Sequence, residues 1–485
     1  MIEDLKPCCE LVREQHDFLY YSERLYERKE GIWRPVQDHE IESYMVEEIK
    51  KIYVNESMAR EFIHVKLTKS AKAEFIDTIK STSFMTAEAV KKRDCPFLIA
   101  FKNCFIDIER FKATGDLKPI DLNFVLGTEY AGYEQRPFFF QQIPHNVNEE
   151  MLAEIAGKGM TPSDILFKYA PHIYDFLESL VGFDRINTQV SKIGYCFYRA
   201  NPYKLMFMEL GDKDSGKTTF IRLLKHIIGT ENISLVSLQD LANYQFAAAR
   251  LFGKLLNLYD DLPTTFIKQT GMLKMLSGES PVGAQRKFKD PIEFDNYAKL
   301  MFVTNKLPSL KEMADEAFFS RWIITEYTNS FKRNDRFFSE LIADEREIEA
   351  LIIAAFYSLA SLLNVGYEFM QGTKNYTELW KCQTNNIYDF MINFERSGKI
   401  KYGPELYVLK DSLYSLYTSF TADERDDTPE KKTSFTQELE RLFHIGASRM
   451  KVEGQMQQVY KGVAIVMKDQ NEPQEKLDYD EVVPE

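Results

Sequence analysis

The run Gly211–Thr218, with the sequence GDKDSGKT, has the residue types and spacing of a phosphate-binding loop. Glycines let backbone N–H groups curl round a β-phosphate, and the start of a following helix adds positive potential. Lys217 would reach the β- and γ-phosphate oxygens, and the Thr218 hydroxyl would ligate Mg²⁺. The pattern therefore predicts ATP and Mg²⁺ as cofactors, bound through Gly211, Asp214, Ser215, Gly216, Lys217, Thr218 and Thr219.

The segments on either side of this loop are those that must position it. Lys204–Leu210 is typical of a short buried strand, and the apolar spacing from Phe220 to Ile228 is typical of a helix. A loop between a strand and a helix is the setting in which this pattern binds phosphate. Nucleoside triphosphate binding is therefore the leading hypothesis.

Two further strands are expected to end in polar residues. Lys254–Tyr259 is an apolar strand followed by Asp260 and Asp261, which is typical of a Walker B element. Asp260 would hold the Mg²⁺ water shell while Asp261 polarises the attacking water. Lys299–Thr304 is another buried strand, and Asn305 after it could orient that water and sense the γ-phosphate. The simpler alternatives are a pair of acids ending a strand at the surface and an asparagine that forms a turn.

Arg321 stands at the start of another predicted strand. There it could reach the nucleotide of a neighbouring subunit and stabilise charge that develops in the transition state. The alternative is an ordinary surface arginine. With Asp260, Asp261 and Asn305, Arg321 completes the predicted catalytic set, in which Thr218 and Asp260 are the metal ligands.

A basic turn lies between the strands, at residues 283–291. Lysines that hold phosphates and an aromatic ring that stacks on a base are what a grip on single-stranded nucleic acid needs. A solvated hairpin tip is the alternative, and this stretch alone favours neither. The predicted DNA-binding residues are Arg286, Lys287, Phe288 and Lys289.

The order of these motifs, closing with the FFSRW sequence at Phe318–Trp322, resembles superfamily 3 helicases. In detail it is similar to the primase-helicase proteins of phages, plasmids and poxviruses. The likeness spans roughly residues 20–465 and is most specific over 204–328. Four other segments carry it, namely Asn243–Phe246, Arg250–Asn257, Leu273–Pro281 and Pro96–Asp107.

The resemblance implies an AAA+ ATPase that forms a hexameric ring and moves 3′-to-5′ on single-stranded DNA at a fork. It makes Asp260 and Asp261 the Walker B pair, Asn305 the first sensor, and Lys287 with Phe288 the tip of a pore hairpin. Many relatives have Glu at the second Walker B position and a pair of arginines where this chain has Ser320-Arg321. The first 200 residues offer no primase residue set, so any primase or polymerase activity is expected on another chain or on a part of the protein outside this sequence.

The expected fold class is multidomain α/β, with an AAA+ P-loop ATPase core. In the C-terminal part, helices over 387–394, 406–420 and 435–443, with strands near 457–460 and 463–467, predict a winged helix. The predicted domains are a mixed α+β N-terminal domain (1–145), a helical collar (146–203), the ATPase core (204–335), a helical segment (336–372), the winged-helix-like domain (373–468) and an acidic tail (469–485).

The composition of the chain restricts the kinds of partner that it can bind. A net charge of −13 argues against coating of nucleic acid over the whole surface, yet permits a local grip repeated round a ring. No apolar stretch is expected to approach the ~20 residues that cross a bilayer, so a cytoplasmic location and no membrane partner are predicted. The 6 cysteines lack zinc-site spacing and are expected to be reduced thiols.

The leading hypothesis is therefore an ATP-dependent replicative DNA helicase of a mobile element, acting as a homohexamer on single-stranded and forked DNA. The alternative is a replication initiator that binds a specific origin duplex through the winged helix, with ATP controlling assembly. A P-loop kinase for a small substrate would need a cluster of lid arginines, which the sequence does not offer.

Overall fold

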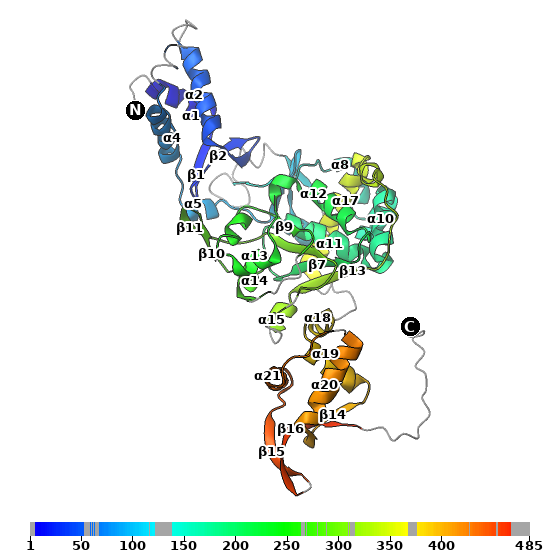
Figure 1. The fold of residues 1–485 in the computed structure, drawn as a ribbon. Helices are drawn as coiled ribbons and strands as arrows, with labels where there is room; N and C mark the ends of the chain where they lie inside the picture. Colours follow the sequence, from blue (N-terminus) through cyan, green and yellow to red (C-terminus); the bar gives the residue numbers. More distant parts are fainter. Residues whose placement is uncertain are drawn as a thin grey trace. The chain divides into compact units, whose positions relative to one another are not determined.

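The computed structural model describes residues 5–52, 59, 61, 63, 67–115, 117–121, 138–262, 267, 269–278, 280–287, 289–308, 310, 316–366, 376–425, 427–452 and 454–466. It is a mixed α/β protein with a parallel sheet and many helices (Figure 1). The chain divides into two compact units, which are described separately. Unit 1 comprises Met1–Pro263, Gln269–Lys306 and Arg321–Thr373, and unit 2 comprises Thr264–Lys268, Leu307–Ser320 and Lys374–Glu485.

Unit 1 begins with two small antiparallel sheets and their helices. A strand at Ile32–Pro35, an amphipathic helix at Asp38–Ile52 and a hairpin formed by Leu98–Ala100 and Cys104–Asp107 lie here. In that hairpin Ile99 pairs with Ile106, and both side chains are buried. The elements are α1 Lys6–Gln15, β1 Phe18–Tyr21, β2 Arg24–Lys29, β3 Ile32–Pro35, α2 Asp38–Ile52, α4 Lys69–Thr82, α5 Ala87–Lys91, β4 Leu98–Ala100, β5 Cys104–Asp107, α6 Ile108–Thr114 and β6 Pro119–Asp121.

A layer of helices follows, in the region predicted as a helical collar. One helix ends at Tyr169 and the next begins at Pro171. Proline has no N–H to continue the hydrogen-bond ladder, although it is well suited to the first helical position. The elements are α8 Glu149–Ile155, α9 Pro162–Tyr169, α10 Pro171–Val181, η2 Phe183–Arg185 and α11 Ile186–Phe197, joined later in the chain by α16 Phe337–Leu341 and α17 Glu345–Val365.

Helix α17 is long and apolar enough to cross a membrane by length and composition, with a mean hydropathy of 1.8 over its best window. The expectation that no apolar stretch would approach this length is therefore wrong. However, 67% of that window is buried within the protein, where α17 packs against α9 and α11. The fold thus uses α17 as the central helix of the main hydrophobic core.

The centre of unit 1 is a five-stranded sheet in the order β13-β7-β12-β9-β8, with every neighbouring pair parallel. All the strands predicted between 204 and 328 are present. Because the strands are parallel, the carboxyl ends of β7, β12 and β9 meet along one edge. The elements are β7 Met206–Gly211, α12 Lys217–Ile228, η3 Thr230–Asn232, β8 Ile233–Ser234, α13 Leu238–Asn243, η4 Ala248–Leu251, β9 Leu256–Tyr259, α14 Gly271–Leu276, β12 Lys299–Thr304 and β13 Trp322–Tyr327.

The basic turn forms the predicted hairpin. Strands β10 (Val282–Arg286) and β11 (Lys289–Phe294) pair antiparallel, with a register shift between Ala284 and Arg286. The chain leaves β11 five residues before β12 begins at Lys299. The hairpin therefore joins the sheet at its amino edge, opposite the edge where the P-loop lies.

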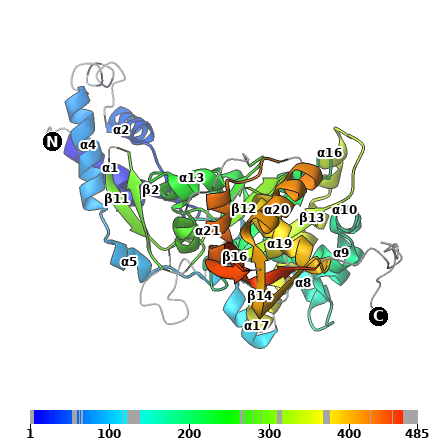
Figure 2. The same ribbon diagram turned by 60° about the horizontal axis from the view of Figure 1, so that its bottom comes forward.

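Unit 2 contains helices and one antiparallel sheet in the order β14-β16-β15. Helices α19 and α20 pack on this sheet, and β14 and β16 lie side by side (Figure 2). The described elements are α15 Glu316–Phe319, α18 Tyr376–Thr384, α19 Asn386–Arg396, β14 Ile400–Leu409, α20 Lys410–Arg425, α21 Lys432–Phe443, β15 Ala447–Val452 and β16 Gln455–Ile465.

Two boundaries in unit 2 differ from the predictions. The helix expected over 406–420 begins only at Lys410, because Tyr407 and Val408 pair with β16 and complete the sheet. The two short strands expected near 457–460 and 463–467 are one strand, β16, which pairs with both β14 and β15. The predicted acidic tail, 469–485, lies outside the described residues.

Candidate nucleotide-binding site

The turn from β7 into α12 requires glycine at two positions, for different reasons. A Cβ on Gly211 would lie 2.7 Å from the Tyr327 carbonyl oxygen of the neighbouring strand. Gly216 caps α12 with a φ of 86°, and a Cβ there would lie 2.3 Å from Leu180 Cδ2. The turn also places Asp214 at a φ of 60°, a conformation that Asp tolerates better than most residues. The predicted succession of strand, tight turn and helix is therefore present, and its two glycines are required partly by residues far away in sequence.

Lys217, the first residue of α12, folds back over the loop. Its Nζ donates to the carbonyl oxygens of Gly211 and Asp212 and to Ser215 Oγ at 3.1 Å. Burial lowers the pKa of Lys217, while the carboxylates of Asp212 and Asp260 oppose this shift. Asp260 thus lies close enough for its charge to act on the lysine, even though 43 positions separate the two in sequence.

The sheet brings the other predicted polar residues to this edge. Strand β12 lies between β7 and β9, and its last residue, Thr304, pairs with Leu210 just before the P-loop. The next residue, Asn305, is exposed in a turn closed by Thr304 Oγ1, which accepts from the Lys306 N–H at 3.2 Å. Asp260 and Asp261 are exposed at the end of β9, and Asp261 has a φ of 58°. The Asp260 and Asp261 carboxylates and the Asn305 amide therefore follow the ends of β9 and β12, beside the strand β7 that leads to Lys217. Thr218 and Thr219 lie in the first turn of α12.

A buried ion pair connects β7, the strand that leads into the Gly211–Thr218 loop, to helix α11. Glu209, two residues before Gly211, accepts from Lys192 Nζ of α11 at 2.6 Å and from the Tyr327 hydroxyl at 2.9 Å. Lys192 Nζ also donates to Thr325 Oγ1 of β13 at 2.6 Å, and neither Lys192 nor Glu209 is exposed to solvent. These hydrogen bonds link α11, β7 and β13, so we expect them to fix the position of β7 and of the loop that follows it.

Replacing Lys192 by methionine is expected to destabilise the protein by about 3–5 kcal/mol, because the Glu209 carboxylate would stay buried without its cation. Urea unfolding monitored by circular dichroism measures the loss. The double variant Lys192→Met/Glu209→Gln removes both charges and should recover much of it. A single variant within about 1 kcal/mol of wild type would contradict a structural role for the pair.

The loop after β13 is part of this site and was missed by the sequence reasoning. The Phe331 N–H donates to the Asp214 carbonyl oxygen at 2.9 Å, and the Phe331 ring lies against Gly216. Arg333, two residues on, pairs with Asp335 at 2.8 Å and has an 85% exposed side chain. Its hydrogen bond to Asp335 raises the pKa of Arg333, and the nearby Asp214 carboxylate adds to this. The two basic residues Lys332 and Arg333, just beyond the end of a predicted strand, were the feature of the sequence that could have indicated this loop as part of the site.

Arg321 lies at the opposite edge of the sheet from the P-loop. It precedes β13, and its carbonyl oxygen accepts from the Met206 N–H at the amino end of β7. The guanidinium Nη1 donates to the Lys274 carbonyl oxygen at 3.2 Å and to Ser277 Oγ at 3.1 Å, at the carboxyl end of α14. A strand rises about 3.3 Å per residue, so the length of β13 puts Arg321 roughly 20 Å from its own P-loop. Arg321 is therefore too far away to act on phosphates bound at the loop of its own chain.

The predicted DNA-binding residues of the hairpin differ in their surroundings. Arg286 is engaged within the chain, donating to the Ser22 carbonyl oxygen at 2.9 Å and pairing with Glu23 at 3.0 Å. Lys287 and Lys289 are exposed. Phe288 lies outside the described residues. The tip thus offers two exposed lysines, while Arg286 anchors the hairpin to the turn between β1 and β2.

A cavity of about 550 Å³ lies next to this anchor, in the N-terminal part of unit 1. Its lining mixes both signs of charge, with Glu23 and Asp38 facing Arg24, Lys80 and Lys289. None of the P-loop residues lines it, so the cavity is distinct from the candidate nucleotide site.

Comparison with known proteins finds a matching family, but the function of that family is unknown. Residues 210–321 match the model of a family of unknown function, DUF5906. None of the curated proteins matches the chain. Among solved structures, the A form apo structure of the NrS-1 C terminal region is 11% identical with a TM-score of 0.47, over 95% of this chain and 100% of that chain. An apo structure of the same region gives 11% identity and a TM-score of 0.49, with the same coverage.

The DUF5906 match begins one residue before the P-loop and ends at Arg321. It therefore coincides with the segment in which the sequence pattern is most specific, and it includes Asp260, Asp261, Asn305 and the hairpin. Neither this family nor the two solved structures assigns chemistry to the chain, so the function is argued from the site.

Proposed function

We propose that this protein is an ATP hydrolase that drives movement along DNA, a replicative helicase of a mobile element. The observation that carries the proposal is the position of β12 between β7 and β9. This order places Asn305 between the loop that would hold the phosphates and the acids that would hold a metal. A water molecule between those groups would lie in line with a γ-phosphate.

The residues at this edge suit a nucleotide with Mg²⁺. A hydroxyl from Thr218 and a carboxylate from Asp260 are oxygen ligands of the kind that Mg²⁺ prefers. The ion would neutralise charge on the β- and γ-phosphates. Lys217 would bind the phosphate oxygens, Asp261 would polarise the attacking water, and Asn305 would orient it.

A ring of subunits, by our proposal a homohexamer, would complete this site. Arg321 is about 20 Å from its own P-loop along β13, so it would serve the nucleotide of the adjacent subunit. Repetition of that contact from subunit to subunit produces a head-to-tail interface, which closes into a ring when the rotation permits. The arginine would then couple each hydrolysis event to the neighbouring subunit.

The hairpin between β10 and β11 is our candidate for the DNA contact. Lys287 and Lys289 are exposed at its tip, at the edge of the sheet opposite the P-loop. Six copies of such a tip would bring many cations to the centre of a ring, although the chain as a whole carries a net charge of −13. The proposed substrate is single-stranded or forked DNA, with 3′-to-5′ movement.

The deciding experiment measures ATP hydrolysis by the full chain with and without single-stranded DNA, followed by unwinding of forks with either a 3′ or a 5′ tail. We expect DNA to stimulate hydrolysis and only the fork with a 3′ loading strand to be unwound. Hydrolysis that ignores DNA, with no unwinding of either fork, would remove the helicase assignment and leave an ATPase of another kind.

Replacing Lys287 by alanine is expected to weaken single-strand binding and abolish DNA-stimulated turnover, while basal hydrolysis stays near normal. The loss of one phosphate contact should reduce the slope of log affinity against log salt by roughly 0.7 per contact. Fluorescence anisotropy across a salt series measures that slope. The control is Lys158→Ala, which removes an exposed lysine beyond α8 and should leave the slope unchanged. An unaltered slope in Lys287→Ala would place the DNA path elsewhere.

A second candidate function, recognition of an origin duplex, is favoured by the order of elements in unit 2. Helices α20 and α21 precede the β15–β16 hairpin, and Arg449 and Lys451 are exposed two residues apart on β15. Side chains two residues apart in a strand share a face, so both cations could meet one duplex. Binding to origin and scrambled duplexes at one salt concentration tests this, and equal affinities would exclude sequence recognition.

A further inference from the structure

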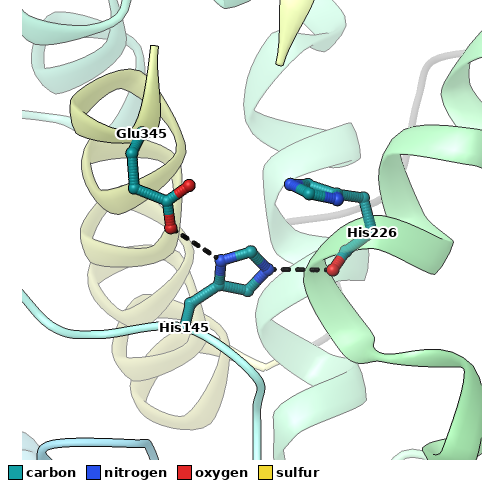
Figure 3. A group of neighbouring side chains, drawn as sticks. All are labelled: His145, His226 and Glu345. Atoms are coloured by element: carbon teal, nitrogen blue, oxygen red, sulfur yellow. Dashed lines mark hydrogen bonds and ion pairs between the residues drawn. The ribbon is translucent and has the colours of Figure 1, made fainter. Parts of the chain in front are cut away.

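Three residues far apart in sequence converge on one side of unit 1, away from the P-loop: His145, His226 and Glu345 (Figure 3). His145 precedes α8, His226 lies in the last turn of α12, and Glu345 is the first residue of α17. One nitrogen or oxygen atom from each lies within 4.8 Å of the others. Three separate segments thus deliver two imidazoles and a carboxylate to one place.

Both ring nitrogens of His145 lie within hydrogen-bond distance of an oxygen atom in this cluster. Its Nε2 lies 2.8 Å from the carbonyl oxygen of His226, and a carbonyl can only accept, so Nε2 must carry a proton. In a neutral imidazole the other nitrogen, Nδ1, is then a bare acceptor. Nδ1 nevertheless lies 3.1 Å from Glu345 Oε1, which is also an acceptor. Either a proton, held by His145 or by Glu345, or a bound cation must therefore lie between the two atoms.

The second histidine distinguishes these two possibilities. His226 Nε2 is buried and has no hydrogen-bond partner among the residues that the structure describes. The His226 ring packs edge-on to that of His145, with 5.0 Å between centroids. A second proton on His145 leaves the His226 nitrogen unsatisfied, whereas a cation satisfies both rings.

We propose that His145 Nδ1, the His226 imidazole and the Glu345 carboxylate bind a divalent cation of the zinc class. Two imidazoles and one carboxylate are a common ligand set for Zn²⁺, with the fourth position taken by water. The Glu345 side chain is 60% exposed, so water can reach the site. The bond from His145 Nε2 to the His226 carbonyl is the outer contact that fixes the orientation of a ligating imidazole.

The three ligand atoms need to move only a short distance to coordinate one zinc ion. Ligand atoms about 2.0–2.1 Å from a tetrahedral zinc lie roughly 3.3 Å apart, and the His145 and Glu345 atoms are already 3.1 Å apart. The remaining approach, by His226, amounts to less than 2 Å from the 4.8 Å limit, roughly what a change of side-chain rotamer provides. The end of α12 and the segment before α8 are closely packed, since a Cβ on Gly229 would lie 3.0 Å from Pro144 Cγ.

The site would tie the carboxyl end of α12 to α17 and to the segment that precedes α8. His226 lies nine residues beyond Lys217, about 14 Å along the helix. The cation is therefore placed to stabilise the helix that carries the P-loop, and it lies too far away to take part in phosphate chemistry. The proposal does not depend on the proposed function.

Zinc binding is measured on the full chain after dialysis against a chelator, by titration with Zn²⁺ in competition with a chromophoric indicator. We expect one tightly bound Zn²⁺ per chain, a higher unfolding temperature, and a tetrahedral absorption spectrum when Co²⁺ is substituted. Less than one equivalent, or no change in unfolding temperature, would overturn the site.

Two variants identify the ligands. His226→Ala and Glu345→Gln should each weaken Zn²⁺ binding by more than about a hundredfold, beyond the 10–100-fold typical of outer contacts. Glu345 is exposed, so its variant should fold even if His226→Ala does not. The control is His39→Ala, which removes an exposed histidine at the start of α2 and should bind normally. Unchanged affinity in Glu345→Gln, or an equal loss in His39→Ala, would show that zinc binds elsewhere.

Discussion

Lys217→Ala is expected to abolish ATP hydrolysis, by on the order of a thousandfold, while the protein stays folded. The hydrogen bonds that the structure shows for its ammonium all go to its own loop, to the carbonyl oxygens of Gly211 and Asp212 and to Ser215, so the loss should leave the core interactions in place. What is lost is the cation that would bind the β- and γ-phosphate oxygens. Phosphate release measures turnover, and circular dichroism with thermal unfolding verifies the fold.

The matched control for this variant is Lys213→Ala. Lys213 is an exposed lysine in the same loop, with the same charge and no predicted role. Its variant should retain most of the activity, which separates a specific phosphate contact from a general loss of positive charge. Asp261→Asn should in turn bind ATP and fail to hydrolyse it. Near-normal turnover in Lys217→Ala or Asp261→Asn would remove the ATPase assignment.

Arg321→Ala is expected to be equally inactive, but for a reason that lies in the neighbouring subunit. The distance of about 20 Å along β13 excludes action on its own P-loop. Mixing Arg321→Ala with Lys217→Ala protein should therefore restore hydrolysis, because an intact P-loop from one variant can meet an intact arginine from the other. At equal, random mixing, roughly one interface in four would pair these halves in a head-to-tail ring.

The mixing experiment also tests the structural alternative for Arg321. Its guanidinium bonds to Lys274 and Ser277 at the end of α14, so alanine there could act by loosening that helix within its own chain. A defect of that kind stays with the subunit that carries it. If exchanging subunits show no activity beyond the sum of the two separate variants, Arg321 has only the structural role.

The sequence by itself determined the features that depend on neighbouring residues. The positive φ of Gly216 is a local requirement of the turn into α12, so the motif predicts strand, loop and helix together, whereas the space that Gly211 leaves is needed by Tyr327 of β13. The buried strands before Asp260 and Asn305 were predicted for the same reason, because continuous apolar runs of this length belong to a sheet covered on both faces.

The tertiary structure decided which strands are neighbours and what each charged side chain touches. Sequence order alone does not place β12 between β7 and β9. Arg286 looked like part of a DNA grip, yet it bonds to a turn more than 260 positions away. Tyr407 and Val408 fit a helical period in the sequence, but in the structure they pair with β16. Pairing with a distant strand thus overrides a weak local preference for helix.

The His145–His226–Glu345 cluster is the extreme case. Its members are about 80 and 120 residues apart, so no spacing rule for metal ligands could detect them. Only packing of α12 and α17 against the segment before α8 brings the three side chains together. Local sequence specifies the turn that would bind phosphate, because the backbone conformation at Gly216 and the change from strand to helix are set within a few residues. Long-range packing specifies the partners of charged groups, because burial and hydrogen bonding depend on the whole fold.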